Sequence, residues 1–302
     1  MDSKIWFDGD IRNYSEVKVP LLTHSLQYGS GIFEGIRAYD SGGKPVIFRL
    51  KEHMERFLRS TKIYRMEFSY SAGELSRAVV EVVRANGFRS CYIRPFAFFS
   101  DDQVSLATLG KHVSVCIVAV PFGQYFGDKI ERGLRCKVSS WRRINSDILP
   151  IQAKASGNYL NSVAAMGEAQ AAGYDEAILL TGNGYIAEGP GENIFLVRDG
   201  KLITPSLESD ILFGITRMSI IELAGDLGID VEERQIHRDE LHTCDEAFFC
   251  GTAAEVTPIV SVDDIPVGDG KPGEVTMKIG RRFMEVVLGK AKEYSGWLTA
   301  VE

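Results

Sequence analysis

The order of apolar patterns along this 302-residue chain predicts an α+β fold. The runs CYIRPFAFF (91–99) and HVSVCIVAV (112–120) predict two strands with only a polar loop, 100–111, between them. Two amphipathic helices, near 50–64 and 73–86, precede these strands instead of alternating with them. A doubly wound sheet would require strict alternation, so the pattern favours helices and strands in separate runs.

The composition is typical of a soluble globular protein, with 45% hydrophobic and 25% charged residues. A net charge of −7 argues against a nucleic-acid binder, because the chain has no compact basic cluster larger than Trp141-Arg142-Arg143. No apolar run reaches the roughly 18 residues that a membrane-spanning helix needs. Five cysteines without a CxxC pair, and no apolar signal core near the start, predict reduced, buried thiols in a cytoplasmic protein.

A linker is predicted between two domains. PFGQYFGDKIERG (121–133) combines a proline, three glycines and a cluster of charges between two apolar strands. We therefore expect a small N-terminal domain at 1–120 and a large C-terminal domain at 134–302. The remaining predicted elements are a hairpin turning at Asp8-Gly9, strands at 46–49 and 134–140, short strands to about 204, and helices at about 157–172, 216–227 and 274–292.

Common metal and nucleotide motifs do not account for the chain. HEXXH and the Walker pattern GxxxxGK[ST] are absent, and the five histidines show no ligand spacing, so no metal site is expected. GDGKPG (268–273) matches GxGxxG, but it contains Pro272 and lies near the C-terminus, so it is interpreted as a turn. Glu188 and Glu192 could form a glycosidase pair by composition, although nothing else argues for sugar binding.

Lys154, in AKASGNYLNS (153–162), is a candidate nucleophile. It is flanked by two alanines and followed by a glycine turn, so it can be partly desolvated. Desolvation lowers the pKa of a lysine and makes its amine suitable for Schiff-base chemistry. The alternative is a surface lysine near the start of a helix.

Two segments could bind an anion through backbone N–H groups. FGIT (213–216) places a glycine and Thr216 at the start of a predicted helix, where N–H groups lack helical partners. CGTAAEVTP (250–258) places Thr252 among small residues at the end of a predicted strand. The alternatives are N-capping by Thr216 and an ordinary turn.

Charged side chains complete the candidate site. Glu188, in AEGPGENIF (187–195), could hold a protonated ring nitrogen, or it could be an exposed loop residue. Tyr92 and Arg94 share one face of a strand and could bind carboxylates. Arg56 could bind phosphate or could be solvated. A lysine nucleophile, two anion cradles, an arginine and a carboxylate are the groups that pyridoxal 5′-phosphate requires.

These segments resemble the fold-type IV pyridoxal-phosphate family, and most closely its branched-chain amino acid aminotransferases. The similar motifs run in order from HSLQYGSGIFEGIRAY (24–39) through CYIRP, AKASGNYLN, AEGPGENIF and FGITR to CGTAAEVTP, and so cover nearly the whole chain. The resemblance implies a small N-terminal α/β domain and a larger C-terminal α/β pseudo-barrel domain. It also implies a homodimer or higher homo-oligomer.

The resemblance also implies roles toward the cofactor. Lys154 resembles the Schiff-base lysine and proton shuttle, Glu188 the partner of the pyridine nitrogen, and Tyr159 the tyrosine that hydrogen-bonds the phenolic oxygen. Arg56 resembles the phosphate arginine. The rest of the phosphate clamp would be Ile215, Thr216 and Thr252.

The implied substrate site accepts both branched aliphatic chains and glutamate. Tyr92 and the backbone near Thr252-Ala253 resemble the α-carboxylate site, and Arg94 resembles the residue that receives the side-chain carboxylate of glutamate. The aliphatic pocket would contain Tyr28, Phe33, Gly35 and Tyr125. The loop 100–111, which in the family closes the partner's site, departs from the usual pattern because it has no glycine before Gly110.

The implied reaction is ping-pong transamination between L-leucine, L-isoleucine or L-valine and 2-oxoglutarate. Alternatives on the same fold are a D-amino acid aminotransferase, an (R)-amine aminotransferase and aminodeoxychorismate lyase. A pyridoxal-phosphate carrier without turnover and a cofactor-free binding module are the alternatives from other classes.

Overall fold

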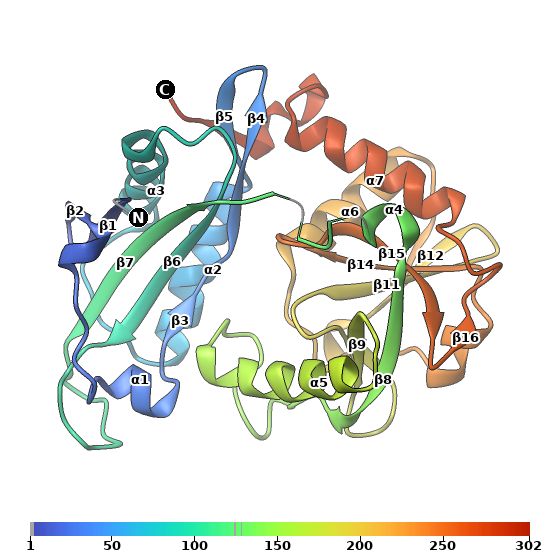
Figure 1. Cartoon of the computed structure of the whole chain (residues 1–302), viewed down its shortest axis with the longest axis horizontal. Helices are drawn as coiled ribbons and strands as arrows, with labels where there is room; N and C mark the ends of the chain where they lie inside the picture. Colours follow the sequence, from blue (N-terminus) through green and yellow to red (C-terminus); the bar gives the residue numbers. More distant parts are fainter. Residues whose placement is uncertain (1–2, 124, 128) are drawn as a thin grey trace. The chain divides into compact units, whose positions relative to one another are not determined.

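The computed structural model describes residues 3–123, 125–127 and 129–302, and the chain forms two compact units (Figure 1). The first unit comprises residues 1–123, 153–157 and 286–302; the second comprises residues 124–152 and 158–285. The predicted linker, 121–133, includes residues 124 and 128, which lie outside the described residues.

The contacts assign two segments to the first unit, 153–157 and 286–302, that the sequence-based division placed in the C-terminal domain. Ala155 forms a β-bridge with Ile32, and the last strand of the chain pairs with a strand of the first sheet. A division at a single linker cannot represent segments that return to an earlier sheet.

An eight-stranded sheet forms the first unit, in the order β17-β5-β4-β6-β7-β1-β2, with β3 paired to β6. Every described strand pair in it is antiparallel. The predicted hairpin is confirmed, with Asp8 and Gly9 at φ 47° and 105° in its turn. The strands are β1 (Lys4–Phe7), β2 (Asp10–Asn13), β3 (Ile32–Phe33), β4 (Ile36–Ser41), β5 (Lys44–Phe48), β6 (Cys91–Phe99), β7 (Val113–Pro121) and β17 (Leu298–Ala300).

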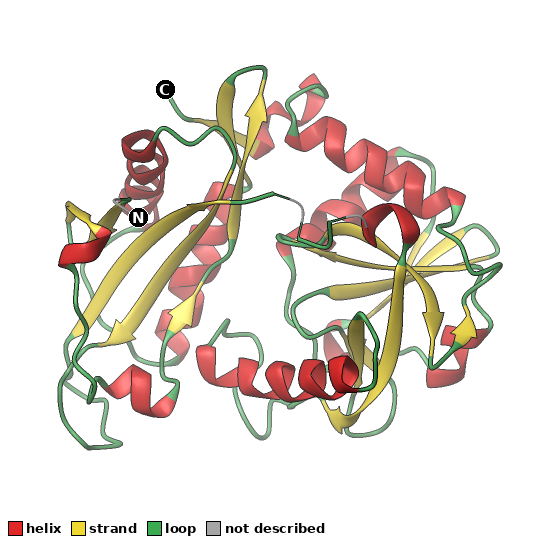
Figure 2. Ribbon diagram, in the orientation of Figure 1, coloured by secondary structure: helices red, strands yellow, loops and turns green. Residues whose placement is uncertain are grey.

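Two helices, α2 (Leu50–Ile63) and α3 (Ala72–Asn86), cover one face of this sheet (Figure 2). Both lie where the sequence predicted them. α3 begins with a capping box, in which the Ser71 side chain accepts a hydrogen bond from the Glu74 N–H and the Glu74 carboxylate accepts one from the Ser71 N–H. Phe57 of α2 is fully buried in the resulting core.

Pro95 lies inside β6, a central strand, although proline is expected at sheet edges. Its carbonyl accepts a hydrogen bond from the Glu34 N–H at 2.9 Å. In an antiparallel ladder the N–H and C=O of one residue point to the same side. The missing N–H of Pro95 therefore faces residues 34–35, where the ladder on that side is interrupted between β3 and β4, and little pairing is lost.

A nine-stranded mixed sheet forms the second unit and is strongly curled (Figure 2). Its order is β10-β9-β8-β15-β14-β11-β12-β13, with β16 paired to β15. The pairs β8–β9, β8–β15 and β12–β13 are parallel. The strands are β8 (Leu134–Arg142), β9 (Glu176–Leu180), β10 (Ile186–Glu188), β11 (Asn193–Arg198), β12 (Lys201–Pro205), β13 (Val231–Arg234), β14 (Glu246–Gly251), β15 (Glu255–Val262) and β16 (Ile265–Pro266).

The helices that the sequence predicted end close to their expected positions, with one exception. The final helix stops at Val287 instead of about 292, because Gly289 adopts φ 70° and its N–H returns to the Val286 carbonyl. The segment 268–273 forms the predicted turn, not a nucleotide-binding loop. The other helices are α1 (His24–Tyr28), α4 (Lys129–Arg132), α5 (Tyr159–Ala171) and α6 (Ile215–Asp226), and the final one is α7 (Glu274–Val287).

All five cysteines carry free thiols, as expected. Cys116 is only half-buried, so the prediction of five buried thiols is wrong at that position: it lies on β7, whose two faces alternate in exposure. Within the described residues, no helix has both the length and the apolar character needed to cross a membrane.

Candidate active site

Candidate residues occur in both units, and each set is described within its own unit. Lys154 belongs to the first unit and lies between β3 and α2. Its carbonyl accepts a hydrogen bond from the Phe33 N–H at 3.0 Å, and its N–H donates to the Ser60 hydroxyl at 3.2 Å. The amine Nζ lies 5.1 Å from the centre of the Phe33 ring. The side chain is half-buried and Ala153 and Ala155 are buried, which argues against an ordinary surface lysine.

Arg56 projects from α2 into a buried cluster around Glu34. Its Nε donates to Glu34 Oε1 at 2.6 Å, and its Nη2 donates to Oε2 at 2.8 Å. His53 Nδ1 lies 2.7 Å from the same Oε2. Burial alone would raise the pKa of Glu34, but Arg56 and His53 outweigh burial and hold this pKa well below its usual value. Arg56 is therefore buried and ion-paired, which corrects the alternative of a solvated arginine.

Four predicted substrate residues of the first unit lie together. Arg94 Nη2 donates to the Tyr92 hydroxyl at 3.0 Å, and the Arg94 guanidinium lies over the Phe33 ring at 4.5 Å. A Cβ atom on Gly35 would lie 2.0 Å from the Tyr92 hydroxyl oxygen, so any larger residue there would displace the Tyr92 side chain. Arg94 is exposed, so the set combines an aromatic wall with a guanidinium at its open side.

Tyr28 is also in the first unit, at the end of α1. Its ring packs edge-on against His24, with the ring centres 4.8 Å apart. These contacts do not connect Tyr28 to the Tyr92 set, so its predicted place in the aliphatic pocket remains a prediction.

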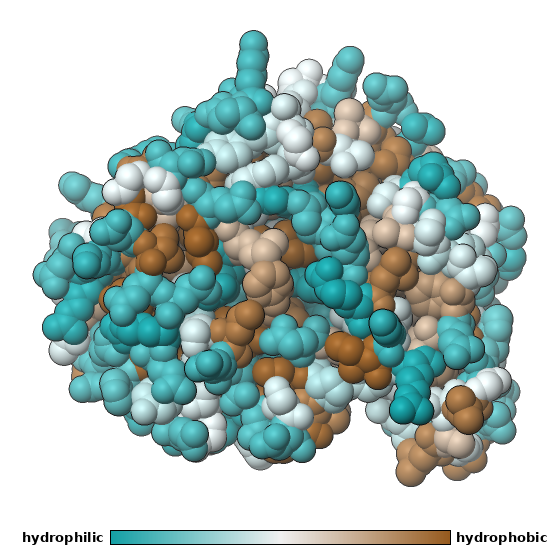
Figure 3. Space-filling model, turned by 180° about the vertical axis from the view of Figure 1, so that it is seen from behind, coloured by the Kyte–Doolittle hydropathy of each residue, from teal (hydrophilic) through white to brown (hydrophobic). Residues whose placement is uncertain are grey.

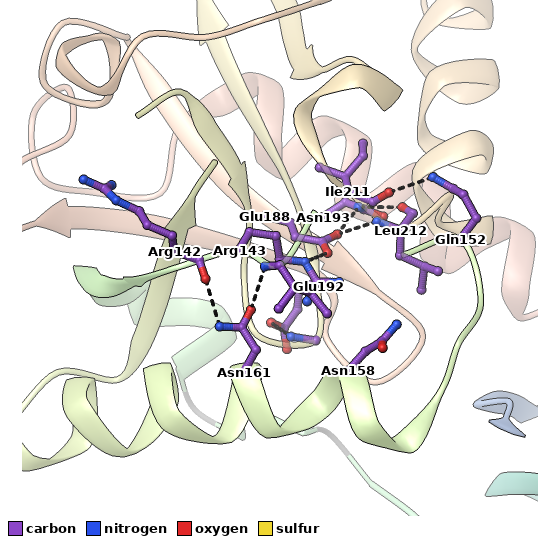
Figure 4. A network of polar contacts seen from close by, with 12 residues as sticks. Arg142, Arg143, Gln152, Asn158, Asn161, Glu188, Glu192, Asn193, Ile211 and Leu212 are labelled. Carbon is purple, nitrogen blue, oxygen red and sulfur yellow. Dashed lines mark hydrogen bonds and ion pairs between the residues drawn. The ribbon is translucent and has the colours of Figure 1, made fainter. Parts of the chain in front are cut away.

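Glu188 lies at the end of β10 in the second unit, almost fully buried (Figure 4). Its Oε1 forms an ion pair with Arg143 Nε at 2.9 Å. Its Oε2 accepts hydrogen bonds from Asn193 Nδ2 at 2.9 Å and from the Leu212 N–H at 3.1 Å. Two hydrogen bonds and one ion pair, from three different segments, therefore fix this carboxylate, and the alternative of an exposed loop glutamate is wrong.

The start of α6 offers the predicted anion cradle. Gly214 is the N-cap residue and no side chain caps the helix, so the first-turn N–H groups at Ile215 and Thr216 lack helical partners. Thr216 lies inside the helix, which excludes the alternative that it serves as the N-cap. A Cβ atom on Gly214 would lie 1.9 Å from Asn193 Oδ1, so the helix start packs directly on the residue that holds Glu188.

Thr252 and Ala253 lie in the turn between β14 and β15. The register of β14 with β11 places Cys250 opposite Asn193. The turn therefore lies at the same end of the sheet as the Glu188 network.

Tyr159 and Tyr125 line a cavity of about 350 Å³ in the second unit, beside α5. Two acidic side chains, Glu176 and Glu192, line the same cavity. Burial, and secondly the carboxylate of Glu192, raises the pKa of Glu176 to about 9.

Three residues that hold the candidate site were missed from the sequence. Glu34 lies in an apolar stretch, where an isolated charge could have indicated a buried ion pair. Arg143 was considered only as part of a basic cluster. Asn193 carried no signal beyond its place in the segment that contains Glu188.

Comparison with known proteins identifies the class to which this fold and these residues belong. The family "Amino-transferase class IV" matches residues 31–262. The chain belongs to the aminotransferase class IV family, and the family predicted from the sequence is confirmed.

Individual relatives are similar to this chain over nearly their whole length. The branched-chain-amino-acid aminotransferase of Escherichia coli (strain K12) is 46% identical over 299 residues, which cover 98% of this chain and 97% of that protein. The branched-chain aminotransferase from Thermoproteus uzoniensis with norvaline is 52% identical, with a TM-score of 0.95 over 99% of each chain. The branched-chain amino acid aminotransferase from Thermobaculum terrenum, solved in its PLP-bound holo-form, is 38% identical, with a TM-score of 0.94, and covers 100% of this chain and 99% of that one.

Proposed function

We propose that the chain catalyses pyridoxal-phosphate-dependent transamination between the L-branched-chain amino acids and 2-oxoglutarate, with ping-pong kinetics. The products are branched 2-oxo acids and L-glutamate. The observation that carries this proposal is the set formed by Phe33, Tyr92 and Arg94 beside the Lys154 segment. An aromatic wall suits an aliphatic side chain, and an exposed guanidinium suits a second carboxylate.

The donors present in the structure fit the cofactor. An uncapped helix start with a buried threonine hydroxyl suits a phosphate dianion, and Gly214 lets the chain pack closely there. The phosphate would be held by the N–H groups of Ile215 and Thr216, by Thr252 and by Arg56. Glu188 would receive the pyridine N–H, and Tyr159 would donate to the phenolic oxygen.

The residues of this chain provide the proton transfers and the orientation. When bound, pyridoxal 5′-phosphate supplies an electron sink for the Cα–H bond of the substrate. Lys154 Nζ accepts the Cα proton and later donates it as general acid. Glu188, fixed by Arg143 and Asn193, keeps the ring nitrogen protonated, since a nearby carboxylate favours a cation.

One pocket must serve two kinds of side chain. Leucine needs apolar contacts. Phe33 and the residues that surround Gly35 would provide them. Glutamate needs a cation for its γ-carboxylate, which Arg94 provides. Because Arg94 is exposed, its charge stays hydrated when leucine is bound, and no unpaired charge is buried.

A homodimer or higher homo-oligomer, with the loop 100–111 closing the partner's site, is part of the proposal. Leu106 and Leu109 in this loop are 78% and 88% exposed, and Leu21 is 84% exposed. Brown apolar side chains interrupt the polar surface on the face shown in Figure 3. The proposed contact with a second copy of the chain would cover the exposed leucines of this loop. A cytoplasmic location stays a prediction from the sequence.

The test is a visible absorption spectrum of the purified protein before and after addition of L-leucine. A cofactor band that bleaches, with formation of 4-methyl-2-oxopentanoate, is the expected result. A band that persists with L-leucine but bleaches with D-alanine or an (R)-amine would move the substrate to those classes. A protein that binds no pyridoxal 5′-phosphate would contradict the proposal.

A further inference from the structure

We propose that Glu34 is a positioning residue for cofactor binding: it fixes the guanidinium of Arg56 in the orientation in which Arg56 binds the phosphate group. This inference rests on the proposed function, which assigns Arg56 to the phosphate. It deepens that function by naming the buried group that orients Arg56.

The contacts between the two side chains determine the orientation of the guanidinium. Glu34 binds one edge of Arg56, through Nε at 2.6 Å and Nη2 at 2.8 Å. Two parallel hydrogen bonds fix both the position and the plane of a guanidinium. The hydrogens on Nη1 and the second hydrogen on Nη2 then point away from Glu34, and these are the donors that the phosphate assignment would use.

Glu34 is itself fixed from two further sides. His53 Nδ1 lies 2.7 Å from Oε2, and the Gly35 N–H donates to the same oxygen at 3.2 Å. Burial lowers the pKa of His53, so at neutral pH the imidazole is uncharged and donates its Nδ1–H to the carboxylate. The cluster therefore holds one negative and one positive charge.

Stability alone is a weak reason for such a pair. Glu34 is fully buried and Arg56 is nearly so. The free-energy cost of removing two charges from water roughly cancels the gain from their mutual attraction. A buried ion pair therefore contributes little net stability. A defined geometry is the effect that a fully desolvated, bidentate pair does provide.

The segment 33–35 connects this pair to the rest of the candidate site in the first unit. Phe33 donates its N–H to the Lys154 carbonyl, and Gly35 packs against the Tyr92 hydroxyl. On α2, Ser60 lies four residues after Arg56 and accepts the Lys154 N–H. An altered Glu34 would therefore act where the cofactor is proposed to bind.

The experiment compares the affinity of the apoprotein for pyridoxal 5′-phosphate with its affinity for pyridoxal, which lacks the phosphate. Glu34→Gln keeps the shape and removes the charge, whereas Glu34→Asp keeps the charge and shortens the reach. We expect both to weaken binding of pyridoxal 5′-phosphate about ten- to a hundredfold, the usual effect of a lost charged hydrogen bond. Binding of pyridoxal should change less than about threefold. The double variant Glu34→Gln/Arg56→Ala should bind no more weakly than Arg56→Ala.

Three outcomes would overturn the inference. Tighter binding of pyridoxal 5′-phosphate to Glu34→Gln would mean that Glu34 only offsets the charge of Arg56. Equal losses for both ligands would mean a general structural role. A phosphate-specific loss in Arg56→Ala but not in either Glu34 variant would contradict the role of Glu34 and leave the proposed function intact.

If every variant, including Arg56→Ala, kept the wild-type preference for pyridoxal 5′-phosphate over pyridoxal, the assignment of Arg56 to the phosphate would be contradicted. The inference about Glu34 would then fail with it. If Glu34→Gln fails to fold, Glu34→Asp and Arg56→Lys test the same geometry with both charges kept. The matched control is Glu240→Gln, which breaks another bidentate pair, with Arg234 at 2.9 and 2.6 Å in the second unit. It should leave both affinities unchanged.

Discussion

Glu34 in the first unit and Glu188 in the second are both buried carboxylates paired with an arginine, but the pairs are built differently. Glu34 binds two donors of Arg56, Nε and Nη2, at 2.6 and 2.8 Å. Glu188 forms an ion pair with Arg143 Nε through Oε1, at 2.9 Å, and accepts hydrogen bonds from two neutral donors, Asn193 Nδ2 and the Leu212 N–H, through Oε2. In the first pair the carboxylate orients the arginine, whereas in the second the surroundings orient the carboxylate.

This difference indicates different tasks for the same side chain. The lone pairs of Glu34 are occupied by Arg56, His53 and a backbone N–H. This carboxylate can therefore affect the site by orienting Arg56. A carboxylate held by a side-chain amide and a backbone N–H is itself presented in a defined direction. We therefore expect changes at Glu34 to alter cofactor affinity and changes at Glu188 to alter the rate of proton transfer.

The largest expected effect is at Lys154, the group on which the proposed chemistry depends. Lys154→Ala removes the nucleophile and the proton shuttle, so turnover of L-leucine with 2-oxoglutarate should fall by about 10⁴-fold or more. The backbone contacts of Lys154 to Phe33 and Ser60 remain possible in the variant, so the Glu34 cluster should stay folded.

Steady-state assays of oxo-acid formation provide the measurement, with circular dichroism as the check of folding. Lys137→Ala is the control, since Lys137 lies near the ring of Tyr174 in the second unit. A folded Lys154→Ala enzyme with the wild-type rate would remove this lysine from the mechanism.

The next effect separates the two carboxylates. Glu188→Gln should slow the single-turnover reaction with L-leucine by about 10²- to 10⁴-fold, because the ring nitrogen loses the charge that keeps it protonated. The affinity for pyridoxal 5′-phosphate should change less than in Glu34→Gln. Rapid-mixing absorbance measures the rate, and Glu168→Gln on α5 serves as a control in the same unit. The comparison fails if Glu34→Gln slows this step as much as Glu188→Gln does.

The sequence pointed to the proposed reacting groups but not to the side chains that hold them in the structure. Lys154 and Glu188 were predicted because each lies in a short motif, and these motifs follow one another along the chain in the order that the family shows. Glu34 and Arg56 are 22 residues apart, on a strand connection and a helix, and only the packing of α2 against β3 brings them together. Arg143 was missed because its partner lies on a strand that comes much later in the chain.

The fold shows the same division. Local patterns predicted the hairpin, α2, α3 and the main strands, because each depends on neighbouring residues. The return of residues 153–157 to the first unit depends on long-range contacts such as the Ala155–Ile32 bridge, which no local pattern contains.

A smaller effect is expected at Arg94. Unlike Arg56 and Arg143, Arg94 has no carboxylate among its described contacts, which are with Tyr92 and Phe33. Arg94→Ala should lower kcat/KM for L-glutamate about ten- to a hundredfold, the usual effect of a lost hydrogen bond to a charge. The value for L-leucine should change less than about threefold. The two half-reactions are measured separately, with Arg12→Ala on β2 as the control. Equal losses in both half-reactions would contradict the assignment.

The smallest effect concerns stability and a third buried carboxylate. Glu176 is fully buried, and its Oε2 has no hydrogen-bond partner among the described residues. Arg56 and His53 hold the pKa of Glu34 down, whereas burial and the nearby Glu192 raise the pKa of Glu176 to about 9. Glu176 is therefore protonated in the folded protein at neutral pH, while the unfolded chain releases this proton above about pH 4.5.

The sign of the pH dependence follows from this difference. Between about pH 4.5 and 9 the unfolded state binds fewer protons at Glu176, so folding loses up to about 1.4 kcal/mol for each pH unit. Glu176→Gln removes this titration and keeps the shape of the acid, so it should raise the urea midpoint relative to wild type at pH 8. The gain should disappear near pH 4. Glu168→Gln replaces a half-buried carboxylate whose pKa is lowered by a hydrogen bond from the Ser139 hydroxyl, so this variant should show no gain in urea midpoint at pH 8. A Glu176→Gln gain that does not depend on pH would mean that burial without an arginine does not protonate this carboxylate.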